Sequence, residues 1–175
     1  MSKLSAKLVA LISAGLLALT GCAGSPQTAA QVGDRRITES EVSQIAWALA
    51  DASADKTDTP AAYNSTVVTL MIQSELAHAA IVEAGITIAD ADRQTLYASN
   101  PQLGQLATQP ATAAFMQRYA DLYLLAQSDA GNDAFTKVVK ATKVVVNPRY
   151  GSWDPTQLEL AATGGSLSEP APTKR

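Results

Sequence analysis

The chain has 175 residues and a formal net charge of −3, and it contains one histidine and one cysteine. One cysteine excludes an intramolecular disulfide, and one histidine excludes a metal site built on two histidines. The acidic balance provides no basic surface for nucleic acid, and this length suits one ordinary domain. Richness in alanine and leucine, with an aromatic content of 5%, is typical of a mainly helical protein.

The first 21 residues have the pattern of a secretory signal. Lys3 and Lys7 precede an apolar run over residues 8–19, which is shorter than the roughly 20 residues that a membrane-spanning helix needs. The run ends in the sequence LTGC at residues 19–22, which resembles the lipobox of bacterial lipoproteins. This resemblance implies cleavage before Cys22 and lipid on its thiol, the alternative being an unused cysteine that happens to follow a signal.

A lipidated Cys22 would hold the protein on the outer face of a bacterial cell membrane. One acyl chain binds a membrane only marginally, whereas the diacylglyceryl group of lipoproteins supplies two chains and a stable anchor. Removal of residues 1–21 takes away two lysines and no acidic residue, so the mature chain has a charge of about −5. The lipid, rather than electrostatic attraction, is therefore the expected contact with the membrane.

The amino-terminal half predicts a tether, a hairpin and two helices. Residues 22–28 are small and polar and form the tether, and residues 30–37 can form two short strands around a turn at Gly33 and Asp34. Thr38 and Glu41 have the spacing of a capping box, which begins the first helix. A second, largely apolar helix is predicted over residues 61–84, followed by Gly85 as its carboxy-terminal stop.

The carboxy-terminal half predicts further helices and a late strand. Helices are expected over residues 90–98 and 110–128, with a weak helical turn at residues 101–106 between them. Gly131 is interpreted as the stop of the longer helix, and Asn132 or Asp133 as the cap of a short helix that ends near Val139. The β-branched residues 143–146 predict a strand, and residues 154–175 predict a disordered tail because they contain few large apolar residues.

Four aromatic residues are candidates for packing or binding. Trp47 lies away from the apolar stripe of the first helix, so it either contacts unfolded client proteins or is covered by another segment. Tyr119 and Tyr123 share one helix face and are expected in the core, with their hydroxyls at its boundary. Trp153 is expected to pack the late strand onto the body.

The polar residues do not assemble into a catalytic site in the sequence. A serine-type triad could use only His78, which is interpreted as a structural or surface residue. Asp90 and Asp92 are two positions apart on a helix and so point in different directions, which favours a role as first-turn charges over a carboxylate pair. No enzyme activity, metal or cofactor is predicted.

Three segments together resemble the amino-terminal chaperone domain of SurA and its parvulin-type foldase relatives. They are residues 31–42 (QVGDRRITESEV), residues 85–90 (GITIAD) and residues 146–153 (VNPRYGSW), and the likeness covers nearly all of residues 29–153. The resemblance implies a helical domain whose first strand pairs with a strand late in the chain. Relatives often carry a parvulin isomerase domain, for which the 14 residues between Ser128 and Lys143 leave no room.

The function implied by this resemblance is that of a membrane-anchored extracytoplasmic chaperone, or holdase, without isomerase activity. Its expected partners are unfolded or partly folded secreted proteins, and nucleic acid is not among them. The alternative is a structural or adaptor lipoprotein that binds one specific folded partner.

Overall fold

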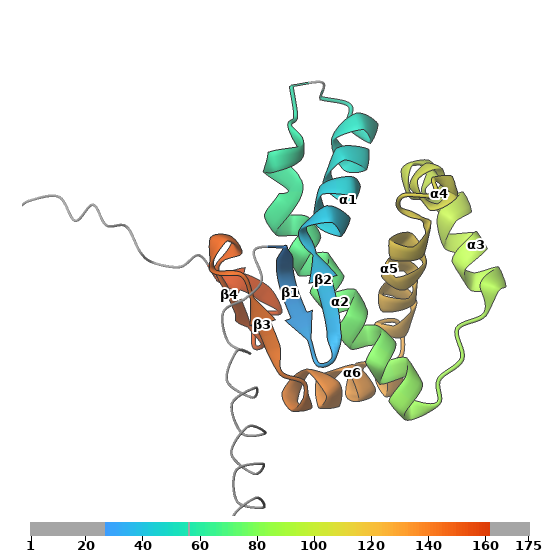
Figure 1. Ribbon diagram of the computed structural model, residues 1–175. Helices are drawn as coiled ribbons and strands as arrows, with labels where there is room; N and C mark the ends of the chain where they lie inside the picture. The colour runs from blue at the N-terminus through green and yellow to red at the C-terminus, as the bar shows by residue number, and fades with distance from the viewer. Residues whose placement is uncertain (1–26, 56, 162–175) are drawn as a thin grey trace, which may run out of the picture.

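The computed structural model describes residues 27–55 and 57–161 of the chain, and Figure 1 shows their arrangement. This part is mainly helical, with six α-helices and a small antiparallel sheet, as the sequence predicts. The predicted signal segment, Cys22 and the tether up to residue 26 lie outside the described residues. Thr28, assigned to the tether from the sequence, already belongs to the first strand.

Three short strands form the larger of two sheets. β1 (Thr28–Val32) is the middle strand, with β2 (Arg35–Thr38) on one side and β3 (Val144–Val146) on the other. Both neighbours are antiparallel to β1, and Ala30 lies opposite Val146 across more than a hundred residues of sequence. The predicted pairing of the first strand with a late strand is therefore confirmed.

The hairpin between β1 and β2 turns at the two predicted residues. Val32 lies opposite Arg35, and Gly33 between them has a φ of +55°, which favours glycine because a Cβ would crowd the backbone. The Gly33 amide donates a 2.9 Å hydrogen bond to the carbonyl of Lys143, just before β3. The turn is thus tied to the late strand as well as to its own hairpin.

A capping box begins α1 (Glu39–Ala52), as predicted. The Glu41 amide donates to the Thr38 hydroxyl at 3.2 Å, and the Glu41 carboxylate accepts from the Thr38 amide at 2.8 Å. Two amide donors that a helix start would otherwise leave unpaired are satisfied in this way.

The central element is α2 (Pro60–Ala84), which packs against α1, α5 and α6 and against the sheet. It ends at Gly85, which confirms the predicted carboxy-terminal stop, and Gly85 has the left-handed conformation of a helix cap, with a φ of +64°. By length and composition α2 could also cross a membrane, a test that the core helix of a folded domain can pass as well. Its many buried positions explain the apolar sequence: Val67, Val68, Met71, Ile72, Leu76, Ala77 and Ala80 are at most 6% exposed.

Three helices form the flank of α2 that lies away from the sheet (Figure 1). They are α3 (Asp90–Ser99), α4 (Pro101–Thr108) and α5 (Ala113–Leu125), and α5 packs directly on α2. The Arg93 guanidinium of α3 lies 2.5 Å from the buried Asp121 carboxylate of α5, which fixes these helices to one another.

The interpretation of Gly131 as a helix stop is wrong. α6 (Asp129–Ala141) is capped by Ser128 rather than by Asn132 or Asp133, and Gly131 lies in its first turn. A Cβ at Gly131 would lie 2.0 Å from the carbonyl oxygen of Leu125, the last residue of α5. Glycine is therefore required by the close approach of two helices and not by the end of one.

The ordered structure extends beyond the predicted start of the tail. A 3₁₀ turn (Pro148–Tyr150) follows β3, and then β4 (Ser152–Asp154) pairs with β5 (Glu159–Ala161) in a second, two-stranded sheet. The prediction of a disordered tail from residue 154 is wrong for residues 154–161, because Leu160 packs against the hydrophobic core. Trp153 also packs there, as predicted. Residues 162–175 lie outside the described part.

Candidate functional site

The main candidate site is an apolar groove of about 490 Å³ formed by α2, α5 and α6 and closed on one side by the turn between β4 and β5. Leucines and aromatic rings make most of its wall, and the side chains of Gln73, Asn132 and Thr136 interrupt it. The lining residues are Leu70, Gln73, Tyr119, Leu122, Tyr123, Leu125, Ala126, Asn132, Phe135, Thr136 and Leu158.

No aspartate, glutamate, lysine, arginine or histidine is among the residues that line this groove. Gln73, Asn132 and Thr136 supply hydrogen-bonding groups that carry no charge. Such a lining suits an uncharged, mainly apolar ligand, because an ionised group would lose its hydration there without an opposite charge to pair with. The groove is thus suited to binding rather than to acid–base chemistry.

An exposed tyrosine marks the rim of the groove. Tyr123 is 50% exposed, so its expected place in the core is wrong, whereas Tyr119 is half-buried and lies 6.2 Å from Phe115, ring centre to ring centre. Because α5 supplies Tyr119 and Tyr123 from adjacent turns, one ring stands inside the wall and the other at its edge. An aromatic ring half in water is a usual contact group at binding surfaces.

Leu158 closes the groove from the turn between β4 and β5. Its φ is +57°, the left-handed region that a leucine rarely adopts. The Gln73 side-chain amide donates a 2.8 Å hydrogen bond to the Leu158 carbonyl, 85 residues away in sequence. One side chain of α2 therefore holds the turn against the groove.

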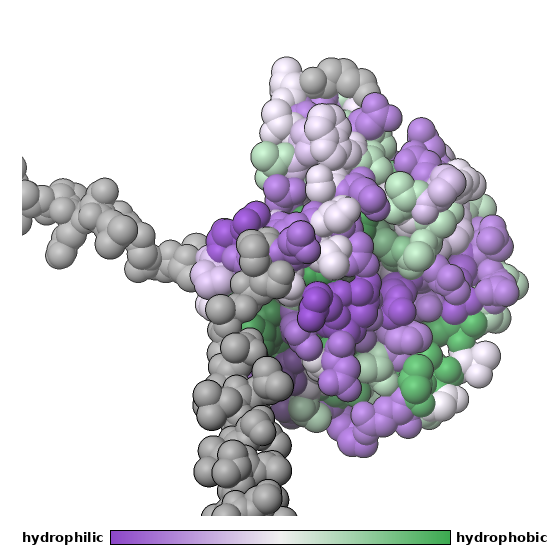
Figure 2. All heavy atoms as spheres, viewed as in Figure 1, coloured by the Kyte–Doolittle hydropathy of each residue, from purple (hydrophilic) through white to green (hydrophobic). Residues whose placement is uncertain are grey.

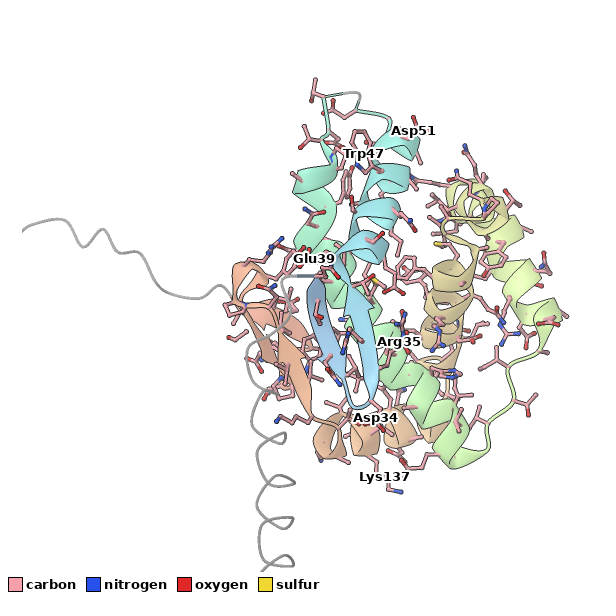
Figure 3. All side chains as sticks on the ribbon, viewed as in Figure 1. Asp34, Arg35, Glu39, Trp47, Asp51 and Lys137 are labelled. Atoms are coloured by element: carbon pink, nitrogen blue, oxygen red, sulfur yellow. The ribbon has the colours of Figure 1, made fainter. Side chains whose placement is uncertain are left out.

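A second, smaller cavity of about 110 Å³ lies between α1, α2 and α5. Its wall contains Glu75, whose 9% exposed side chain contacts Arg35 Nε at 3.3 Å and Arg118 Nη1 at 2.8 Å. Arg35 also pairs with Glu41. Figure 3 shows Arg35 on the side of β2 that faces α5. The Ser74 hydroxyl is buried there without a hydrogen-bond partner among the described residues.

The charged side chains around the second cavity stabilise the fold. Burial by itself raises the pKa of Glu41, but hydrogen bonds from Arg35 and Thr38 outweigh it and leave this pKa below its ordinary value. Glu75 joins β2 to α5 through its two arginines. The charges are therefore already paired within the protein, and this cavity is a poorer candidate for ligand binding than the groove.

Trp47 is exposed, which decides between its two predicted environments. Its exposed fraction is 63%, and it lies on α1 in the part of the molecule where α1 and α2 run side by side (Figure 3). Trp47 lines neither the groove nor the smaller cavity. The face of the molecule drawn in Figure 2 is mostly hydrophilic, with hydrophobic residues in separate small patches.

The remaining candidate residues are not brought together. His78 is exposed on α2, and Asp90 and Asp92 lie in the first turn of α3, where Asp90 pairs with Arg93 at 2.5 Å. Within residues 27–55 and 57–161, no three His, Cys, Asp or Glu side chains are grouped so as to hold a metal ion. The predicted lipidation site, Cys22, lies outside the described residues.

Sequence reasoning missed the groove. Its wall is assembled from three helices and a turn. Taken alone, each leucine or aromatic residue in this wall has the sequence pattern of an ordinary core residue. Two signals were available: Tyr123 lies four residues after Tyr119, near the end of α5, and Gln73 directly follows the apolar residues 70–72 of α2.

Comparison of the chain with protein-family models, with curated proteins and with solved structures gives no match. The likeness to the amino-terminal domain of SurA therefore depends on the three sequence segments alone. The helical architecture and the pairing of β1 with β3 agree with that likeness but do not establish it.

Proposed function

We propose that this protein is a membrane-anchored, extracytoplasmic holdase of SurA-like type, which covers apolar segments of unfolded secreted proteins and lacks isomerase activity. The observation that carries the proposal is the uncharged apolar groove between α2, α5 and α6. An unfolded chain exposes apolar side chains joined by uncharged main-chain amides, and the groove has apolar walls together with uncharged hydrogen-bonding groups.

The lipobox-like sequence at residues 19–22 supports the anchoring and the location. Secreted proteins are unfolded when they emerge at the outer face of the membrane, so a tethered domain would meet them there. Trp47 and Tyr123 give two further exposed aromatic contacts, one on α1 and one at the groove rim.

The test uses the chain from residue 23 to residue 175, which keeps every described residue. Added near stoichiometric amounts, it should suppress aggregation of several unrelated, chemically unfolded proteins, because a holdase acts by covering surface. It should leave the slow, proline-limited phase of their refolding unaccelerated, a phase that takes about 10 to 100 s uncatalysed at 25 °C. Acceleration of that phase would contradict the proposed lack of isomerase activity.

A charge at the groove rim tests the site itself. Tyr123→Asp should weaken suppression with little change in melting temperature, because the side chain is 50% exposed. Val145→Asp is the matched control, since Val145 is equally exposed on β3 and lies outside the groove. Equal loss in both variants, or suppression of no client by the parent protein, would instead favour an adaptor lipoprotein with a single folded partner.

A further inference from the structure

The turn between β4 and β5 places an apolar side chain and a main-chain carbonyl at the groove. Leu158 contributes an apolar side chain to the groove wall, and its main-chain carbonyl accepts the 2.8 Å hydrogen bond from Gln73. The groove therefore already contacts a short length of polypeptide through one side chain and one main-chain oxygen. An extended segment of another protein offers the same two groups.

The main-chain conformation of Leu158 is unusual for a leucine. Among the described residues other than glycine, Leu158 alone has a positive φ. The left-handed region is disfavoured for leucine because Cβ approaches the carbonyl oxygen too closely. Residues with such strain cluster at sites where a segment is held by its surroundings and can be released.

The attachment of this turn to the body is local. β4 and β5 contain three residues each and pair only with one another in their sheet. Trp153 on β4 and Leu160 on β5 pack against the core, but the intervening residues 155–157 are exposed. Release of Leu158 would break the Gln73 hydrogen bond and loosen β5, while Trp153 keeps β4 packed on the core.

We infer that the groove binds an extended peptide segment through a leucine-sized apolar side chain and the adjoining carbonyl, and that Leu158 occupies this subsite until a client displaces the turn. This inference rests on the proposed holdase function and names the chemistry of its client subsite. Gln73 is the shared donor, first to the Leu158 carbonyl and then to the client carbonyl. The subsite beside Gln73 is thus filled by the protein's own turn when no client is present, and the rest of the groove is open.

The probe is a fluorescein-labelled nonapeptide of alternating serine and leucine, measured by fluorescence anisotropy with the chain from residue 23 to residue 175. Leu158→Gly removes the competing side chain and permits the positive φ, so the peptide should bind about tenfold more tightly. Gln157→Ala changes an exposed residue of the same turn that does not line the groove, and it should leave affinity unchanged. In the Leu158→Gly background, Gln73→Leu should reduce the affinity again because the side-chain donor to the client's main-chain carbonyl is lost.

Hydrogen exchange of the unmodified protein gives a second measurement that does not depend on the folding of a variant. Addition of the peptide should speed backbone exchange at residues 156–161 and slow it at residues 122–125 of α5. Unchanged exchange at residues 156–161, or equal affinity of the parent and Leu158→Gly, would overturn the inference.

The two proposals fail in different ways. If the parent protein suppresses aggregation and Leu158→Gly binds the peptide no better, the holdase function stands and Leu158 does not compete with clients. If neither the parent nor any variant binds the peptide or suppresses aggregation, the groove is not a client site and the proposed function fails as well.

Discussion

The Tyr150 hydroxyl donates a 2.6 Å hydrogen bond to the carboxylate of Glu39, 111 residues earlier at the start of α1. Burial and the Glu39 carboxylate together raise the pKa of Tyr150 to about 12. Because the folded-state pKa lies above the unfolded value of 10, this stabilisation is complete below pH 10 and is lost as pH rises through about 12. Urea denaturation between pH 8 and pH 12 should show the free energy of unfolding falling in that window.

Tyr150→Phe is the control for this pH dependence. The variant should be less stable than the parent at pH 8, because it leaves the partly buried Glu39 without its phenol donor, and the difference should shrink above pH 10. Identical alkaline profiles for the parent and Tyr150→Phe would show that the bond contributes nothing to stability.

Gly131→Ala should destabilise the domain by about 3 kcal/mol or more, because the new Cβ would overlap the carbonyl of Leu125. Gly104→Ala on α4 is the comparison and should destabilise the domain less. Its Cβ would lie 3.1 Å from the nearest atom, the carbonyl oxygen of Tyr97, and alanine favours helix. Thermal melts of both variants check this order. A Gly131→Ala protein as stable as Gly104→Ala would contradict the close helix approach.

Three truncations test the carboxy-terminal boundary. A chain ending at Ala161 keeps all described residues and should melt near the parent temperature. A chain ending at Asp154 loses the packing of Leu160, worth about 1 to 2 kcal/mol for a partly buried leucine, and should melt a few degrees lower. A chain ending at Thr142 loses β3 and should not melt cooperatively, because β1 then lacks one neighbour and the core is uncovered.

Cys22→Ala should abolish labelling by a metabolic fatty-acid probe and slow the removal of the signal segment. The reason is that the predicted processing acts on the lipid-modified cysteine at the end of the LTGC sequence. Gel analysis of labelled cells measures both effects. Equal labelling of the variant and the parent would refute the lipoprotein prediction.

Trp47→Ala should weaken suppression of aggregation while changing the free energy of unfolding by less than about 0.5 kcal/mol, because the side chain is 63% exposed. Chemical denaturation and light scattering on the same samples separate the two effects. Unaltered suppression would remove Trp47 from the client surface without affecting the case for the groove.

Local signals in the sequence were sufficient for most of the helical architecture. The pair Thr38 and Glu41 predicted the start of α1, and Gly85 predicted the end of α2, since each acts within one helical turn. The pairing of β1 with β3 was implied by the resemblance, and it also gives both strands hydrogen-bond partners for their main chains.

The failures concern contacts between distant segments. Gly131 follows a helix, as a helix-terminating glycine would. Glycine is instead required there because the backbone of Leu125 lies next to it in the folded chain, a contact that the sequence does not show. β5 is three residues long and was missed because Leu160 is its single large apolar residue. The groove could not be predicted because the positions of Leu158 and Gln73 relative to one another depend on the folded chain.

The central place of β1 has a mechanical consequence for a protein held by its amino terminus. A pull along the strand from the lipid anchor that we propose would enter at Gln27 and load the hydrogen bonds to β2 and β3 together. These bonds run across the strand, so such a force shears both ladders at once, whereas an edge strand peels away one bond at a time. With the proposed anchor, the domain would be attached at the strand best placed to carry tension.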